Sequence, residues 1–293
     1  MITELHSKGL YTTWINLPEI NTAFDCGEGM ASHLGNRCFG VRQIFLSHDH
    51  TDHTAGLIPF LGIRSVGFGE KNTPLNIYFP AGNRIIQEIR DFHDRVMPVP
   101  TYPLQWIPIH PGDEIPLPGF GKTPRAIRAF EVVHGTSPRG QTLGFSVLET
   151  RKSLLPEFQK LPPQEIEARR KAGETLTAPT KKKLLVYSGD AYRVPPSELE
   201  GAALLLHDCT FLNPADRDKE SISHATLGEV VQAAKEANIK KVLGIHISPR
   251  YKKEDIAEAQ HHLNREKTGV TLVPPYRPFT YFKEAADQKQ EIH

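Results

Sequence analysis

The chain has 293 residues and an almost balanced charge, with 35 Lys or Arg against 34 Asp or Glu. A net charge of +1 gives no overall electrostatic field of the kind expected of a dedicated nucleic-acid or membrane-surface binder. The net charge does not reveal a local basic patch. Three cysteines without paired spacing predict reduced thiols rather than disulfides. No apolar run is long enough to span a membrane and the first residues do not resemble a signal peptide, so we expect a cytoplasmic protein.

Short strands alternating with turns and helices are expected in the first half of the chain. Glycines in the segment 25–29 (DCGEG) predict a tight turn that leads into a helix. The expected strands are 10–15, 22–25, 43–46, 74–78, 104–109, 126–133 and 143–148, and the expected helices are 30–34, 83–93 and one that begins near residue 54.

The second half repeats this alternation. Thr226 and Glu229 have the spacing of a helix capping box. The expected strands are 184–187, 203–206, 241–245 and 270–273, and helices are expected after Thr226 and over 254–265. Because strands and helices alternate in two similar halves, the pattern predicts an α/β fold with four layers, an αββα sandwich, in a single domain over residues 1–293.

Residues 151–182 differ in character from both halves. They are rich in Lys, Arg and Glu, and Pro162 and Pro163 begin a plausible helix over 164–172 that Gly173 ends. We therefore predict a surface insertion at about 151–182 rather than a part of the core.

The segment from His48 to His53 contains three histidines and two aspartates directly after a predicted strand. Imidazole nitrogen and carboxylate oxygen are ligands of zinc-type cations. In an extended chain His48 and His50 point the same way and can reach one cation, while Asp52 and His53 can serve a second. Two such ions can hold a hydroxide between them for a displacement reaction. A histidine-rich surface loop without metal is the alternative.

Further candidate ligands favour the metal site, because each of them follows a predicted strand and strand ends hold side chains rigidly around a shared cleft. The predicted set has one bridging carboxylate, Asp190, and two groups of three side chains: His48, His50 and His134 for one ion, and Asp52, His53 and His246 for the other. Nitrogen and oxygen ligands suit two divalent ions, zinc first, with manganese or iron as alternatives.

The pattern His-x-His-x-Asp-His after a strand resembles the metallo-β-lactamase superfamily, and His50 in place of an acid favours its hydrolases over its oxidoreductases. Several other segments are similar to ribonuclease Z, the tRNA 3′-processing endonuclease family: 25–29 (DCGEG), 74–78 (PLNIY), 187–190 (YSGD), 223–226 (SHAT) and 246–251 (HISPRY). The resemblance implies a metal-dependent phosphodiester hydrolase, an RNA substrate such as the 3′ end of a tRNA precursor, and a homodimer.

The resemblance also implies roles for individual residues. His224 would assist protonation of the leaving oxygen, and Asp208, which stands where the family usually has glutamate, would orient it. Such a carboxylate fixes the tautomer of an imidazole and raises its proton affinity. Asp52 would orient or deprotonate the attacking water. Arg250 is a candidate phosphate clamp, because guanidinium matches phosphate in a bidentate way; a surface arginine is the alternative.

Two departures from the family leave other functions open. The opening strands lack the family's Gly-x-Gly and Arg-Asn pattern, and residues 151–182 lack the glycine- and proline-rich arm with which ribonuclease Z grips tRNA. The first alternative is a small-molecule hydrolase acting on a cyclic nucleotide, another phosphodiester or a lactone at the same site. The second is a non-catalytic RNA- or partner-binding protein that keeps the fold.

Overall fold

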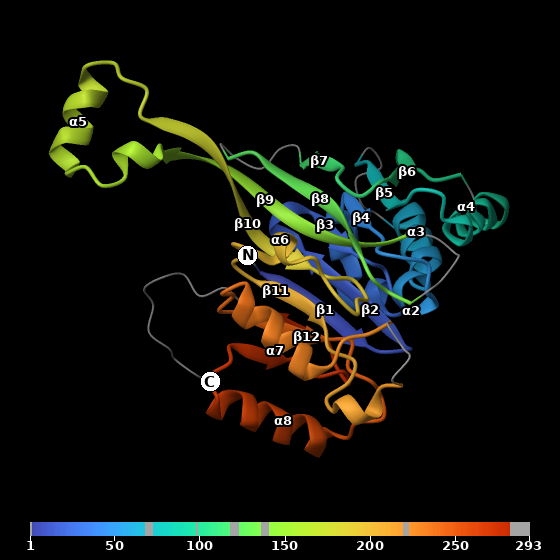
Figure 1. Cartoon of the computed structure of the whole chain (residues 1–293). Coiled ribbons are helices and arrows are strands. Elements are labelled where there is room, and N and C mark those ends of the chain that lie inside the picture. Colours follow the sequence, from blue (N-terminus) through green and yellow to red (C-terminus); the bar gives the residue numbers. More distant parts are fainter. Residues whose placement is uncertain are drawn as a thin grey trace.

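The computed structural model describes residues 2–67, 73–97, 99–117, 123–135, 141–218 and 223–281. Within them, two mixed seven-stranded sheets face each other and helices lie on both outer faces (Figure 1). The αββα sandwich expected from the sequence is confirmed. None of the described helices combines the length and apolar character needed to cross a bilayer.

The first sheet comes mainly from the N-terminal half, and its strands β3 to β6 run parallel. Helices α1 (Met30–Leu34), α3 (Leu57–Val66) and α4 (Arg84–Val96) cover its outer face, where their side chains enclose the buried Trp14 and Ile77. Its strand order is β14 (Phe279–Tyr281), β1 (Thr3–Lys8), β2 (Thr12–Leu17), β3 (Thr22–Phe24), β4 (Gln43–Phe45), β5 (Leu75–Pro80) and β6 (Leu104–Ile109).

The second sheet is covered on its outer face by α7 (Leu227–Glu236) and α8 (Lys253–Arg265). The predicted capping box begins α7: the Thr226 hydroxyl accepts from the Glu229 backbone, and the Glu229 carboxylate accepts from the Thr226 backbone. The strand order is β13 (Val270–Leu272), β12 (Val242–Ile245), β11 (Leu205–Asp208), β10 (Thr177–Tyr187), β9 (Thr142–Leu154), β8 (Arg125–Val132) and β7 (Glu114–Leu117).

Stacked aromatic rings join the two sheets. Phe24 lies with its centroid 5.3 Å from that of Phe145 and 5.5 Å from that of Tyr187, and all three side chains are fully buried. Burying one such ring stabilises the fold by about 1.5–3 kcal/mol. Since Tyr187 ends β10 and Phe24 ends β3, this stack fixes the two sheets relative to each other beside the segments that carry the predicted ligands.

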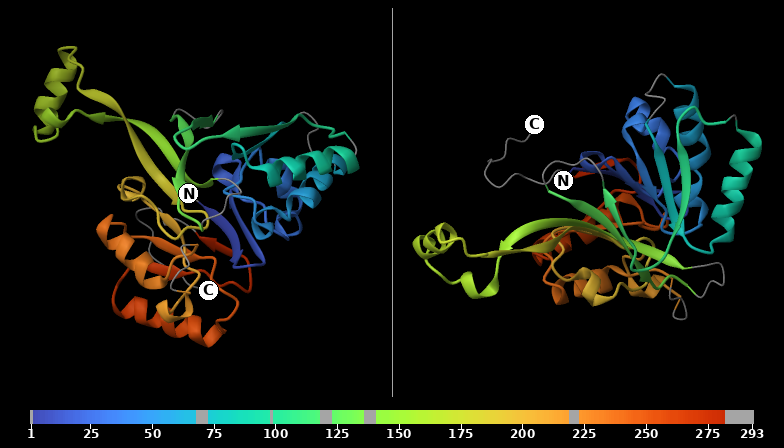
Figure 2. Two further views of the ribbon diagram at one scale, coloured as in Figure 1. Left: turned by 45° about the vertical axis from the view of Figure 1, so that its right-hand side comes forward. Right: turned by 90° about the horizontal axis from the view of Figure 1, so that it is seen from above.

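Residues 151–182 project from the body as an arm (Figures 1 and 2). Strands β9 and β10 continue past the second sheet as an antiparallel ribbon that pairs Leu154 with Thr177, and α5 (Pro163–Lys171) caps it. Phe158 and Leu176 are buried at the tip, and the Arg169 guanidinium lies 5.6 Å from the Phe158 ring centroid. The helix expected over 164–172 is present. The segment forms an arm, although its sequence lacks the glycine- and proline-rich composition expected of the ribonuclease Z arm.

The remaining differences from the expected elements are local. Residue 10 is the turn before β2, with φ of +70°, rather than part of a strand. The helix expected near residue 54 is divided into α2 (Thr51–Thr54) and α3, and the strand expected over 203–206 lies at 205–208. Short helices complete the described chain at α6 (Pro196–Leu199), Pro18–Ile20, Gly35–Gly40, Pro156–Phe158 and Pro214–Asp216.

Candidate metal centre and active site

The predicted ligands meet at one edge of the sandwich. The segment that runs from His48 to His53 follows β4, a parallel strand of the first sheet. In the second sheet, His134 follows β8, Asp190 follows β10 and His246 follows β12, and these three strands run in the same direction. The edge therefore collects side chains from both sheets at the carboxyl ends of their strands.

The ligand atoms fall into overlapping groups around Asp190, one of which joins Asp190 and His246 with Asp208 and His224. His48, His50, His134 and Asp190 offer ligand atoms that all lie within 4.8 Å of one another, and the same holds for Asp52, His53 and His246. One Asp190 oxygen lies 3.2 Å from His53 Nε2, and the other lies 3.4 Å from His246 Nε2 and 3.7 Å from His48 Nε2. Asp190 thus stands between the two predicted groups.

Three buried ligand atoms have no hydrogen-bond partner among the described residues: His48 Nε2, His53 Nε2 and Asp190 Oδ2. A buried polar atom without a partner costs about 1–3 kcal/mol. Here the unpaired atoms are electron-pair donors that face the same group of side chains, so divalent cations would satisfy them together. The residues therefore fit the metal site that the sequence predicts.

Asp25 supports two of these histidines. Its carboxylate accepts hydrogen bonds from His53 Nδ1 at 2.7 Å, from the Ser47 amide and hydroxyl at 2.7 and 2.9 Å, and from the Tyr187 hydroxyl. Because the Ser47 hydroxyl donates to Asp25, it accepts from His48 Nδ1 at 2.9 Å. Both imidazoles therefore carry their proton on Nδ1 and keep Nε2 free for a metal.

Asp208 makes the equivalent arrangement in the second sheet. The Thr210 hydroxyl donates to Asp208 at 2.7 Å, so it accepts from His246 Nδ1 at 2.9 Å. The Nδ1 of His134 likewise donates to the Ser223 carbonyl at 2.6 Å. Sequence reasoning did not identify Ser47 and Thr210 as site residues. Their positions were the available signal, because Ser47 directly precedes His48 and Thr210 lies two positions after Asp208.

Asp208 also holds His224, the contact that the resemblance to ribonuclease Z implies. His224 Nδ1 lies 2.7 Å from Asp208 Oδ2, and the His224 ring stacks on His246 with centroids 5.0 Å apart. The shorter aspartate therefore reaches the imidazole. Burial lowers the pKa of His224, but the charge and hydrogen bond of Asp208 outweigh burial and raise this pKa to about 9. At neutral pH the side chain is an imidazolium that can donate a proton.

The charges of the cluster favour a cation at its centre. Burial lowers the pKa of His53, but the carboxylates of Asp190 and Asp25 outweigh it and hold this pKa well above its usual value. Burial raises the pKa of Asp52, but the hydrogen bond with His246 outweighs it and lowers this pKa. Asp52 is therefore an ionised carboxylate that can accept a proton or orient a water molecule.

Arg250 lies beside this site with part of its guanidinium already engaged. Its Nε donates to the Ser248 hydroxyl at 3.2 Å, its Nη1 donates to the Asp216 carbonyl at 2.8 Å, and its guanidinium carbon lies 5.2 Å from the Phe211 ring centroid. A bidentate phosphate clamp that uses Nε would require the contact with Ser248 to break.

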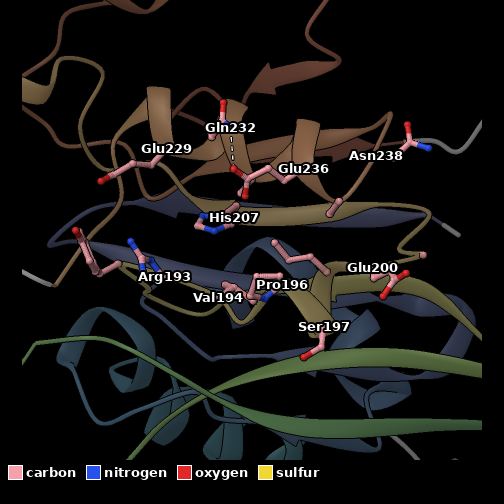
Figure 3. Close-up of a pocket in the computed structure, with 15 residues that line it drawn as sticks. Arg193, Val194, Pro196, Ser197, Glu200, His207, Glu229, Gln232, Glu236 and Asn238 are labelled. Carbon is pink, nitrogen blue, oxygen red and sulfur yellow. Dashed lines mark hydrogen bonds between the residues drawn. The ribbon is translucent and has the colours of Figure 1, made fainter.

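A separate cavity of about 1010 Å³ lies between α7 and the segment 192–201 (Figure 3). The described residues that line it include His207 but none of the predicted metal ligands. His207 Nδ1 donates to the Asp208 carbonyl at 2.7 Å, and burial lowers the pKa of this imidazole. Successive strand residues point to opposite faces, so β11 turns His207 toward this cavity and Asp208 toward the metal cluster.

Comparisons with known proteins agree with this geometry. Residues 20–172 and 157–247 match the model of the beta-lactamase superfamily domain. The ribonuclease Z of Methanosarcina acetivorans is 32% identical over 252 residues, which cover 78% of each chain. The crystal structure of the short form of human tRNase Z has a TM-score of 0.61 at 20% identity and covers 95% of this chain and 98% of its own. The metallo-beta-lactamase fold protein YhfI of Bacillus subtilis has a TM-score of 0.60 at 18% identity, with coverage of 96% and 100%.

Proposed function

Because this chain belongs to the ribonuclease Z family of the beta-lactamase superfamily and is a metal-dependent hydrolase, we propose that it hydrolyses phosphodiester bonds of RNA at the 3′ end of tRNA precursors. In this proposal the seven predicted ligands bind two divalent ions, for which zinc is the first candidate. It also uses Asp52, His224 and Asp208 for the chemistry.

The charge of the arm is the observation that favours RNA over a small substrate. Residues 151–182 contain eight Lys or Arg and four Glu, a net charge of +4. The whole chain has a net charge of +1, so the remaining residues carry −3. Positive charge concentrated on a projecting element attracts a phosphate backbone, whereas a small ester would gain nothing from it.

The side chains divide the hydrolysis between them. Divalent ions bound by the seven ligands would supply Lewis acidity and activate water. The Asp52 carboxylate lies 3.1 Å from His246 Nε2, within the second ligand group, and orients the attacking water there or accepts its proton. His224, held by Asp208, donates a proton to the leaving oxygen, which would otherwise depart as an unstable alkoxide.

The test is cleavage of a precursor tRNA with a 3′ trailer by the metal-loaded protein, beside hydrolysis of bis(p-nitrophenyl) phosphate. Cutting after the discriminator base supports the proposal, and Asp52→Ala should abolish it. Asp49→Asn is the matched control, because Asp49 lies in the same segment but is not a predicted ligand, and this variant should retain activity. Turnover of the small ester alone would instead indicate a small-molecule phosphodiesterase, and no turnover of either would indicate a binding protein.

The homodimer and the cytoplasmic location stay predictions. A homodimer would give twice the 32.8 kDa mass of the chain in light scattering. The exposed apolar side chains of α3 and α4, among them Val66, Phe92 and Val96, are the surface on which we would test it first.

A further inference from the structure

Phe211 lies beside His224, the residue proposed to protonate the leaving oxygen. Its ring meets the His224 ring edge to face, with centroids 6.4 Å apart and planes at 73°. The backbone holds it in place: the Phe211 amide donates to the Ala225 carbonyl at 3.2 Å, and the Leu227 amide donates to the Phe211 carbonyl at 2.7 Å. Phe211 is only half-buried, so this rigidly held ring remains accessible to a ligand.

Arg250 extends this ring with a second planar group. Its guanidinium lies over the Phe211 ring, and its hydrogen bonds to Ser248 and Asp216 fix its orientation. The next residue strengthens the arrangement, since the Tyr251 hydroxyl donates to the Asp216 carboxylate at 2.6 Å and accepts from the Leu212 amide at 3.0 Å. The Arg250 side chain is exposed, so the stack ends in solvent beside His224.

We propose that the Phe211–Arg250 stack is a nucleobase-binding subsite for the nucleoside that carries the leaving oxygen. The inference rests on the proposed function, because it takes His224 as the proton donor to that oxygen. A ribose placed with its oxygen at His224 has its base within reach of the adjoining stack. Planar aromatic and guanidinium groups bind the faces of bases with little preference for sequence.

The hydrogen bonds of Arg250 favour this role over that of a phosphate clamp. Its Nε donates to Ser248 and its Nη1 donates to Asp216, so two of the five guanidinium N–H groups are engaged and the side-on donor pair that includes Nε is not free for phosphate. The same bonds fix the position of the guanidinium over the Phe211 ring through N–H groups at its edge, so they do not use its faces. A guanidinium fixed in this way loses little conformational entropy when a base stacks on it.

The experiment compares three RNA substrates with the metal-loaded protein. One is intact, one has an abasic ribose on the leaving-oxygen side of the scissile phosphate, and one has an abasic ribose on the opposite side. Analysis of the product ends identifies which side carries the leaving oxygen. The variants are Arg250→Lys, which keeps the charge and removes the plane, and Phe211→Leu, which keeps apolar volume and removes the ring.

The wild type should lose about 5- to 150-fold in kcat/KM when the base on the leaving-oxygen side is removed, since stacking on one base contributes about 1–3 kcal/mol. Removal of the opposite base should have a much smaller effect. On the intact RNA, each variant should be less active than the wild type. On the RNA that lacks the base on the leaving-oxygen side, variant and wild type should have similar activity, because the stacking interaction is absent from both.

A matched control comes from another arginine on an aromatic ring. The Arg193 guanidinium carbon lies 5.8 Å from the Tyr192 ring centroid, but Arg193 lines the cavity between α7 and the segment 192–201 rather than the metal site. Arg193→Lys should therefore keep the wild-type dependence on the base. Metal content and thermal unfolding verify that each variant is folded. If Phe211→Leu does not fold, the comparison is made with Arg250→Lys alone.

Three outcomes separate the possibilities. A wild type that cuts intact and abasic RNA equally well overturns the subsite but leaves the proposed function standing. Variants that lose the same factor on both RNAs also overturn it, and they assign Phe211 and Arg250 a purely structural role next to His224. A wild type that cuts no RNA at all overturns the proposed function and the subsite together.

Discussion

Two carboxylates, Asp25 and Asp208, organise the site at the level of single residues. Each accepts directly from one imidazole of the site, and each orients a second imidazole through a hydroxyl group, Ser47 or Thr210. The pairing has a simple physical basis: a hydroxyl that donates to a carboxylate can only accept from the neighbouring imidazole. The ring orientation of four histidines and the proton on each Nδ1 are therefore fixed before any metal binds.

Asp25→Asn should weaken metal binding. The amide cannot accept hydrogen bonds from Ser47, His53 and Tyr187 with both of its terminal atoms, so His53 and His48 lose their fixed orientation. Loss of such a supporting carboxylate typically costs 10- to 100-fold in metal affinity. Competition with a chromophoric chelator measures this. Asp94→Asn is the control, because Asp94 makes a similar 2.9 Å contact with His93 away from the site. Equal affinities in wild type and Asp25→Asn would refute the role of Asp25.

His224→Gln should affect substrates according to their leaving groups. RNA releases a poor alkoxide, so loss of the proton donor should lower kcat on RNA by about 10²- to 10⁴-fold. Bis(p-nitrophenyl) phosphate releases a stable phenolate that needs little protonation, so its hydrolysis should fall far less. Rates on both substrates and the bound metal are measured together. Equal losses on the two substrates would show that His224 supports the metal site rather than the leaving group.

The arm contains strand residues that the pattern of apolar and polar residues did not predict. Strands were expected over 143–148 and 184–187, yet β9 and β10 extend to Leu154 and back to Thr177. The body of the sheet buries its side chains, whereas most side chains of the projecting ribbon are in contact with solvent. An exposed ribbon has no alternation of apolar and polar residues, so only its backbone pairing, which the sequence does not display, marks it as a strand.

Neutralising the basic residues of the ribbon should separate RNA binding from chemistry. Residues 155–176 at the tip contain four Lys or Arg and four Glu, so the net positive charge of the arm comes from Arg151, Lys152, Lys181 and Lys182. With these four residues changed to Gln, KM for precursor tRNA should rise at least tenfold and its dependence on salt should become less steep. Hydrolysis of bis(p-nitrophenyl) phosphate should stay near the wild-type rate. An unchanged KM for the RNA would remove the main support for an RNA substrate.

At the scale of the whole molecule, the candidate metal centre connects the two halves of the sandwich. His48, His50, Asp52 and His53 come from the first sheet, while His134, Asp190 and His246 come from the second. Ions bound by both groups would therefore join the sheets at the edge where the buried ligand atoms are otherwise unpaired. The stability of the fold and the occupancy of the site should be linked.

Chelation of the metal should lower the melting temperature. Metal that binds only the folded state at 100 times its Kd stabilises that state by about 2.7 kcal/mol. Calorimetry of the zinc-loaded and chelator-treated protein measures the shift, and Asp190→Ala should reduce it because Asp190 lies between the two ligand groups. A single transition under both conditions would support the single domain predicted for residues 1–293. Identical melting temperatures would argue against a metal site between the sheets.

The sequence by itself determined what depends on short spacing and on the ends of strands. The candidate ligands between His48 and His53 could be recognised because they are adjacent in the sequence, and the αββα layers follow from alternating strands and helices. The positions of His134, Asp190 and His246 could be predicted because each one ends a strand. The tertiary structure alone decided which partners those side chains meet. Asp25 reaches Tyr187 across 162 residues, and Phe211 meets Arg250 only because the loops that follow β11 and β12 lie side by side. Contacts of this kind depend on strand register and loop packing, which local residue patterns do not encode.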